Sequence, residues 1–340
     1  MQTNKLSSHW ATASLVAVSL LVPALLWGQS DRGTITGTVS DPAGAVIPGA
    51  KVVAKSPENG SVLETVTTAT GNYTLPSLPV GAYDLSVEAA GFTKYIQEGI
   101  HIQVVQTARI DIVLQVGSTT QSMTVTADAT LLRTESAEQS ATVNGDKVNE
   151  LPMSFSNNPR SPIGFAGITP GATNISGSNI QMHVNGAPDN TFRTLVDGQD
   201  ITSGIDPSHL SETQPSVEAL QQASIQSSNF AAEFGQVTGG LVNLTSRSGT
   251  DQYHGSGYEY FVNRVLNAGQ AYTNNGSGGL VNPFIRNNDW GATIGGPVRI
   301  PHLYNGHDKT FFFFNFEQYK TFSFVSGTPL ETVQIGRAHV

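Results

Sequence analysis

Short segments in which apolar and polar residues alternate recur along this chain of 340 residues, and they limit the folds that it can adopt. Alternation with a period of two is typical of β-strands with one buried face, because successive side chains point to opposite sides of a strand. The chain also contains 35 glycines and 17 prolines, which favour turns over long helices. The pattern therefore predicts a mainly β protein, and the length suffices for about two or three domains.

The composition excludes several kinds of partner and cofactor. The formal net charge is −9 and no basic stripe occurs, so we expect no nucleic-acid partner. Cysteine is absent, which excludes disulfides and thiolate metal sites. The eight histidines lack the spacing of a metal site, and neither a Gly-x-Ser-x-Gly elbow nor a phosphate-binding loop occurs. We therefore expect no enzyme, no cofactor and no metal.

The first 30 residues have the features of a secretory signal peptide. Lys5 is their only charged residue, and Ala11 to Trp27 is largely apolar. Small residues suit cleavage after Ser30, and a cut after Gly28 is the alternative. A membrane anchor is the other interpretation, but the apolar stretch is short and contains a proline. We predict a signal peptide at residues 1–30 and export of the rest.

Residues 31–117 contain about seven short alternating segments that share an apolar face. Turn-forming residues separate them, as at Asp41–Gly44. Short strands at this spacing predict a β-sandwich. The apolar face includes Ile35, Val39, Ala50, Val52, Ala54, Leu63, Tyr83, Leu85, Val87, Ala89, Ile100, Ile102, Val104, Ala108, Ile110, Ile112 and Leu114.

The stretch 215–249 predicts a small assembly of short strands that packs closely against a partner. Ser216 can cap a short helical turn at its start. The pair Gly239–Gly240 removes side chains where another segment must approach. The predicted strands and a compact piece between them lie at 223–226, 230–235 and 241–245.

An Asp-Gly pair at residues 197 and 198 predicts a type I′ hairpin turn, because both central positions of that turn need a positive φ. We expect the Asp197 carboxylate to accept hydrogen bonds from turn amides, a structural role that we favour over catalysis.

The last quarter of the chain has longer alternating segments that are richer in aromatic residues. Apolar residues alternate with small or polar residues around Tyr258, Trp290 and Phe314. Segments of roughly ten residues with this pattern are typical of outer-membrane barrel strands. The Asn- and Gly-rich stretch 267–282 would be an extracellular loop. A soluble sandwich is the alternative interpretation, and it suits residues 311–314 equally well.

Three parts of the chain resemble parts of one receptor family. GTVSDPAGAVIPGAKV, GNYTLPSLPVGAYDLSVEAAGF and RIDIVL resemble the carboxypeptidase regulatory-like, or transthyretin-like, domain, which has no peptidase residues. The stretch 215–249 resembles the plug signature of TonB-dependent outer-membrane receptors, as do Val148–Pro152 and Pro159–Gly171. HGSGYEYFVN, RNNDWGATIGGP and KTFFFFNFEQY resemble the first barrel strands of the Oar-like branch of that family.

One short extended segment in the linker 118–130 resembles the TonB box of these receptors. A periplasmic energy-coupling protein captures such a strand mainly through main-chain hydrogen bonds, so the segment must be extended and accessible. An ordinary linker strand is the alternative. The predicted partner-binding residues are Met123, Thr124, Val125, Thr126 and Ala127.

The resemblance implies a transporter in the outer membrane, with its N-terminal module in the periplasm. Its expected partners are a TonB-type coupling protein, outer-membrane lipid and an unknown extracellular ligand such as an oligosaccharide, a peptide or a metal chelate. An extracellular structural or adhesive β-sandwich protein is the alternative. The implied domains are a signal peptide (1–30), a transthyretin/Ig-like β-sandwich (31–117), a linker (118–130), an α+β plug (131–248) and the first strands of a truncated β-barrel (249–334).

The C-terminal part is too short for the barrel that the resemblance implies. A plugged barrel of this class has about 22 strands, whereas the residues after 249 suffice for about three or four. The last six residues, IGRAHV at 335–340, match one reading frame of a common sequencing adapter. We expect residues 335–340 to be a sequencing artefact at the end of a gene fragment, and the codons of these residues would test this.

Overall fold

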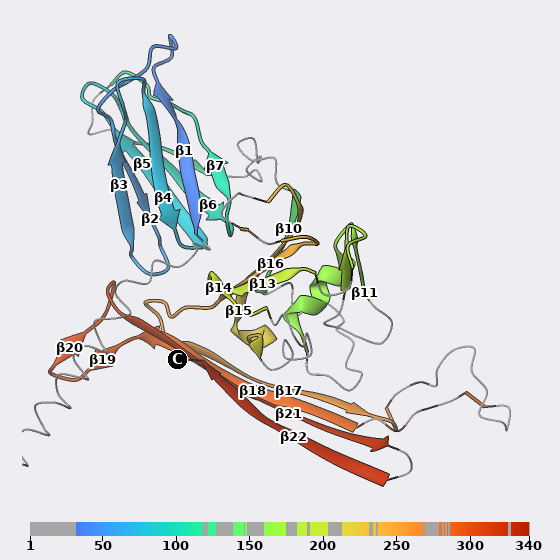
Figure 1. Cartoon of the computed structure of the whole chain (residues 1–340). Coiled ribbons are helices and arrows are strands. Elements are labelled where there is room, and N and C mark those ends of the chain that lie inside the picture. Colours follow the sequence, from blue (N-terminus) through green and yellow to red (C-terminus); the bar gives the residue numbers. More distant parts are fainter. Residues whose placement is uncertain are drawn as a thin grey trace, which may run out of the picture. The chain divides into compact units, whose positions relative to one another are not determined.

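The computed structural model contains three groups of strands (Figure 1). We call them the sandwich (residues 33–113, with one strand added at 122–126), the central domain (139–246) and the long sheet (the four longest strands after residue 253). Among the residues described, no helix has the length and apolar character needed to cross a membrane. The structure describes residues 32–117, 122–126, 139–145, 147, 160–174, 182–188, 191–202, 213–230, 234–235, 237–266, 268, 279–280, 282, 284, 286–325 and 328–339.

The sandwich has two sheets around one apolar core. One sheet has the order β4-β1-β7 with β8 also on β1, and the other has the order β3-β2-β5-β6-β9. The strands are β1 (Gly33–Ser40), β2 (Lys51–Lys55), β3 (Val62–Val66), β4 (Asn72–Leu78), β5 (Gly81–Glu88), β6 (Lys94–Ile102), β7 (Thr107–Arg109), β8 (Ile112–Val113) and β9 (Ser122–Thr126).

The burial pattern of the sandwich follows the predicted alternation. Every second residue of β1 is buried, and Ile35, Leu85 and Ile100 in the core have no exposed surface. Leu63 and Ala89 lie at the margin of this core and are only partly buried. The predicted β-sandwich is confirmed.

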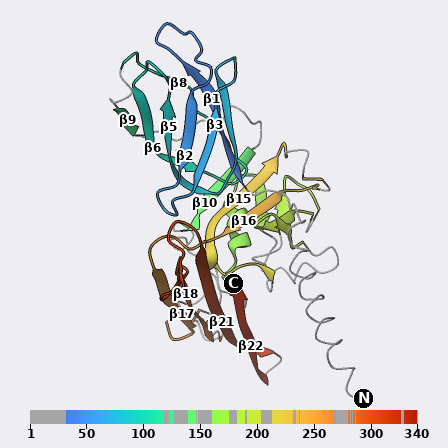
Figure 2. The same ribbon diagram turned by 90° about the vertical axis from the view of Figure 1, so that its left-hand side faces the viewer.

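β9 differs from its expected position. The sequence suggests that this segment leaves the sandwich, but β9 pairs in parallel with β6, from Lys94 opposite Ser122 to Glu98 opposite Thr126. Figure 2 shows β9 beside β6 at the end of the sheet. A parallel partner about 28 residues away leaves no signal in a local pattern, because the register depends on the rest of the fold.

The central domain is a five-stranded sheet of order β10-β15-β16-β13-β14 with a separate hairpin, β11–β12. Its core contains Ile163, Phe192, Leu220 and Val242. The elements are β10 (Gln139–Asn144), η2 (Pro162–Ile168), β11 (Ala172–Asn174), β12 (Met182–Val184), β13 (Arg193–Val196), β14 (Gln199–Asp200), η4 (Val217–Ala219), β15 (Leu220–Ser228) and β16 (Leu241–Ser246), where η is a 3-10 helix.

Two local predictions hold in the central domain. The hydroxyl of Ser216 caps η4 by accepting a hydrogen bond from the amide of Ala219 at 3.2 Å. Asp197 and Gly198 have φ angles of 49° and 79° and form the two-residue turn between β13 and β14.

The hydrogen-bond donors to Asp197 differ from the prediction. The Asp197 carboxylate accepts hydrogen bonds from the amide and hydroxyl of Ser246 in β16, at 2.8 and 2.6 Å, rather than from amides of its own turn. Its role is structural, and it joins the turn to a neighbouring strand.

The pair Gly239–Gly240 permits a close approach, but its nearest neighbours lie within the central domain. A Cβ on Gly239 would be 2.7 Å from the Thr191 hydroxyl, and one on Gly240 would be 2.8 Å from Val184. The resemblance to a plug implies a barrel wall as the close partner of this stretch, whereas the nearest neighbours of both glycines belong to the central domain itself.

The long sheet is an antiparallel meander of order β17-β18-β21-β22 (Figure 1). Its inner face is polar, since Asn287, Asp289 and Asn315 are at most 1% exposed. Its outer face is apolar, with Trp290 and Ile294 42% and 50% exposed. The bounds of these strands and of a small hairpin between them are β17 (His254–Asn263), β18 (Arg286–Pro297), β19 (Arg299–Ile300), β20 (Tyr304–Asn305), β21 (Phe311–Val325) and β22 (Thr328–His339).

Candidate functional site

Three charged side chains meet where the central domain contacts the long sheet. Arg160 lies just before η2, Glu218 lies in η4, and Asp289 lies in β18. Only 3%, 8% and 1% of their respective surfaces are exposed. Charged side chains are almost never buried to this extent unless they are paired, so the cluster needs a structural or functional explanation.

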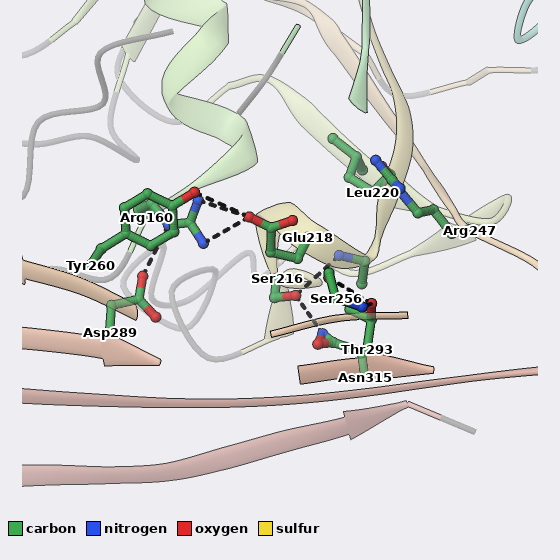
Figure 3. Close-up of polar contacts among 11 residues, drawn as sticks. Arg160, Ser216, Glu218, Leu220, Arg247, Ser256, Tyr260, Asp289, Thr293 and Asn315 are labelled. Atoms are coloured by element: carbon green, nitrogen blue, oxygen red, sulfur yellow. Dashed lines mark hydrogen bonds and ion pairs between the residues drawn. The ribbon is translucent and has the colours of Figure 1, made fainter. Parts of the chain in front are cut away.

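The guanidinium of Arg160 bridges the two carboxylates (Figure 3). Its Nε donates to Oδ2 of Asp289 at 3.1 Å, while Nη1 and Nη2 are 3.3 and 3.4 Å from Oε1 of Glu218. The hydroxyl of Tyr260 in β17 donates to the same oxygen of Glu218 at 3.3 Å. Two segments of the central domain and two strands of the long sheet therefore share one network.

Two tyrosines of β17 form an aromatic wall around the cation. The guanidinium carbon of Arg160 lies 3.7 Å from the ring centroid of Tyr260 and 5.1 Å from that of Tyr258. A planar guanidinium can stack on an aromatic ring while its edge binds carboxylates. A lysine lacks the planar fork that lets one group stack on a ring and donate to two carboxylates at once.

Arg160 remains a cation in this environment. Burial alone would lower the pKa of its guanidinium, but the charge and hydrogen bond of Asp289, together with Tyr260 and Glu218, outweigh burial and raise that pKa. Removing one partner of a buried ion pair leaves an uncompensated charge, which costs about 3–5 kcal/mol. The cluster therefore links two parts of the chain, and the loss of any one member would leave a buried charge uncompensated.

The cap of η4 makes a second connection to the long sheet. Asn315 in β21, which is fully buried, donates a hydrogen bond from Nδ2 to the hydroxyl of Ser216 (Figure 3). The same hydroxyl accepts from the amide of Ala219. The turn η4, which presents Glu218 to Arg160, is thus connected to the long sheet through its capping residue.

One trio of residues among those described has side chains that suit a metal. His307 Nδ1 is 2.9 Å from Asp308 Oδ2 and 3.5 Å from Asp251 Oδ1, and the amide of Asp308 donates to Asp251 at 2.8 Å. These contacts already form a closed turn, since the imidazole of His307 contacts both carboxylates and the Asp251 carboxylate accepts from the amide of Asp308. We assign no metal to it.

The described part of the predicted partner-binding segment pairs with the sandwich, whereas the Arg160 cluster joins the central domain to the long sheet. Met123, Thr124, Val125 and Thr126 belong to β9, and the ladder of β9 is with β6 of the sandwich. Ala127 lies outside the described residues. The partner-binding role of these five residues stays a prediction.

The sequence did not identify Arg160, Glu218 and Asp289 as a cluster. Arg160 is 58 residues from Glu218 and 129 residues from Asp289 in the chain, so no local spacing connects them. A signal was nevertheless present, because only 13% of the chain is charged and Asp289 lies on the polar side of a strand whose other side carries Trp290. A charge on the inner face of a predicted barrel strand needs a partner of opposite sign where a plug buries it away from water.

Two regions of the chain match known protein families. Residues 34–115 match the carboxypeptidase regulatory-like domain, and residues 245–333 match an outer membrane beta barrel domain. The first match covers the sandwich without β9, and the second covers the long sheet almost to its end. The predicted resemblance is confirmed for both regions.

A curated relative matches nearly the whole chain. The TonB-dependent transporter Oar of Myxococcus xanthus is 29% identical over 322 residues, which cover 90% of this chain and 28% of the relative. The chain is thus homologous to a transporter, and it spans about a quarter of the length of that relative. The homology and the barrel-domain match indicate a protein of the outer membrane.

Solved structures give weaker likenesses. The siderophore receptor PirA from Acinetobacter baumannii is 16% identical, with a TM-score of 0.34, over 54% of this chain and 24% of that one. The catechol 1,2-dioxygenase of Acinetobacter radioresistens is also 16% identical, with a TM-score of 0.21, over 31% of this chain and 57% of that one. TM-scores this low do not bear on function.

Proposed function

We propose that this homologue of a TonB-dependent transporter takes part in energy-coupled uptake of a ligand across the outer membrane. The observation that carries the proposal is the polarity of the long sheet. Its apolar face is exposed at Trp290 and Ile294, while its polar face is buried against the central domain through Asp289 and Asn315. An apolar outer face and a polar inner face are what a barrel in lipid requires.

The central domain then acts as the plug of this barrel. It supplies Arg160, Glu218 and Ser216, which bind the polar face of the long sheet. The outer face contacts outer-membrane lipid. The cluster holds the plug in the lumen, and energy supplied through a coupling protein releases it.

The linker strand is the proposed site of that coupling. Met123–Ala127 is extended where it is described, and an extended strand can pair with a strand of a TonB-type periplasmic protein through main-chain hydrogen bonds. The homology to a TonB-dependent transporter supports a partner of this kind. The sandwich precedes the linker in the chain and lies with it in the periplasm.

The ligand class is open among oligosaccharides, peptides and metal chelates. A strain that lacks the gene provides the test, with growth measured on an oligosaccharide, a short peptide or an iron chelate as the limiting nutrient. We expect one of the three to fail, and expression of the full-length gene to restore uptake that a proton-motive-force uncoupler abolishes. Uncoupler-resistant uptake, or full-length protein recovered in the soluble fraction, would contradict the proposal and favour an adhesive role.

A further inference from the structure

The strand with the proposed coupling residues is already paired within the chain. Met123–Thr126 lies in β9, which pairs in parallel with Tyr95–Glu98 of β6. In Figure 2 this strand is at the end of the sheet that also contains β5 and β2. A partner that needs an accessible extended strand therefore meets one that the sandwich is holding.

The sandwich holds β9 only lightly. Met123 is 46% exposed, Thr124 is exposed and Val125 is partly buried, and none of the three belongs to the described core of the sandwich. The strand has five residues, and parallel pairing is slightly less stable per residue than antiparallel pairing. β9 is held mainly by main-chain hydrogen bonds, which are also what a strand-adding partner offers.

The sandwich is complete without this strand. The match to the regulatory-like domain ends at residue 115, before β9 begins. On its other edge β6 pairs with β5, and Ile100 and Ile102 of β6 lie in the core. β9 can therefore leave while the rest of the sheet stays folded.

We propose that β6 and the coupling protein compete for β9, so that coupling requires the strand to leave the sandwich. This inference rests on the proposed function and adds a regulatory step to it. The next described strand after β9 is β10 of the central domain, so a pull on a released β9 is transmitted to the plug. A pull on a docked β9 is borne first by the ladder with β6. Docking also raises the apparent Kd for the coupling protein, which equals the intrinsic Kd divided by the undocked fraction.

A second mode of binding must be distinguished from this competition. The outer edge of β9 pairs with no strand among the described residues. A partner that added to this edge would leave β9 on the sandwich. A covalent link between β9 and β6 separates the two modes, because it blocks release and leaves the outer edge open.

The chain suits such a link because it contains no cysteine. Ile96 and Thr124 are opposite each other in the ladder, so the double variant Ile96→Cys/Thr124→Cys should form a disulfide on mild oxidation. Glu98 is two residues further along β6, about 8 Å from Thr124, which is beyond the reach of a disulfide. The pair Glu98→Cys/Thr124→Cys is therefore the matched control for register, and the single variants control for the substitutions themselves.

Binding is measured on the full-length protein in detergent, with the purified periplasmic domain of a TonB-type coupling protein as the probe. The oxidised Ile96→Cys/Thr124→Cys protein should bind at least about tenfold more weakly than its reduced form, because the competent fraction falls. Reduction should restore the affinity that the Thr124→Cys single variant shows, and neither single variant should respond to oxidant.

Each other outcome is decisive. Equal binding by the oxidised and reduced forms would show that the partner uses the outer edge or another segment, and would overturn the competition. A crosslink that forms as readily in the Glu98→Cys/Thr124→Cys control would overturn the docked register. Wild-type protein that does not bind the probe would instead overturn the proposed function, and the competition with it, even where the crosslink reports β9 on β6.

Discussion

The sandwich and the long sheet use the same two-residue alternation in opposite senses. In β1 of the sandwich, Ile35 and Val39 are fully buried, whereas Thr36 and Thr38 on the other face are partly exposed. In β18 of the long sheet, Asp289 is buried and its neighbour Trp290 is 42% exposed. The difference teaches that alternation establishes a strand with two unlike faces, while the surrounding solvent decides which face is hidden.

The two regions also treat charge differently. The ion pair of Lys51 and Glu64 in the sandwich has an N–O distance of 2.7 Å, yet both side chains are more than half exposed. In the Arg160 cluster at the long sheet, the side chains of all three charged residues are buried. Solvent screens the first pair, whereas the second depends on every partner being present.

The largest effect is expected when the buried cluster is broken. Arg160→Ala leaves Glu218 and Asp289 buried without their cation, and we expect the contact between the central domain and the long sheet to lose about 3–5 kcal/mol of stabilisation. Protease digestion of the central domain and thermal unfolding of the full-length protein measure the loss. Lys51→Ala is the control from the sandwich, and it should leave both measurements unchanged. Similar responses from the two variants would remove the distinction between the regions.

A cavity in the sandwich core should have the next largest effect. Leu85 has no exposed surface, so Leu85→Ala should destabilise the sandwich by about 2–5 kcal/mol. Proteolysis of the sandwich across a urea series provides the measurement. Val62→Ala, at a position 53% exposed, should change stability by less than about 0.5 kcal/mol. A tolerated Leu85→Ala would show that this face is not a packed core.

Substituting arginine for one exposed apolar residue in each region tests whether that region faces lipid or water. Ile294 and Val62 are 50% and 53% exposed, so they are matched in accessibility. Ile294→Arg should cost about 2–4 kcal/mol if that face lies in the hydrocarbon core of the membrane, whereas Val62→Arg meets water. Heat-modifiable migration and the yield of full-length protein in outer membranes report the difference. Equal tolerance of both changes would mean that the long sheet faces water.

The smallest effect concerns a buried hydroxyl of the sandwich. Tyr83 donates to the carbonyl of Pro79 at 2.9 Å, and burial, opposed by Arg32 and assisted by Glu58, raises the pKa of Tyr83 to about 12. Its stabilising contribution is complete below pH 10.0, the ordinary value. Above that pH the unfolded chain loses the proton first, so stability falls until about pH 12.

Tyr83→Phe should cost about 1 kcal/mol at neutral pH and reduce the loss of stability above pH 10.0. Urea unfolding of wild type and variant at a series of pH values measures both quantities. An unchanged slope above pH 10.0 would show that the hydroxyl titrates normally.

Features set by neighbouring residues could be predicted from the sequence. The turn at Asp197–Gly198 needs only two residues of the right kind, and the cap at Ser216 needs only the next three. The apolar face of the sandwich strands also followed from their alternation. In each case the physical cause lies within the segment itself.

Features set by distant residues could not be predicted in the same way. Asp197 accepts hydrogen bonds from Ser246, and β9 pairs with β6. Neither partner is determined by residues next to Asp197 or β9 in the sequence. The partners of Arg160 depend on how the central domain meets the long sheet. Polar side chains on the inner face could be anticipated, but the identity of the residue that binds them could not.

The composition of the Arg160 cluster also has a consequence for the order of assembly. Arg160 and Glu218 both belong to the central domain, so their pairing needs no residue of the long sheet. The central domain can therefore neutralise its own cation before it meets β18. Asp289 of the long sheet then joins an existing pair. A central domain assembled in this way has no unpaired cation in its core when the long sheet packs against it.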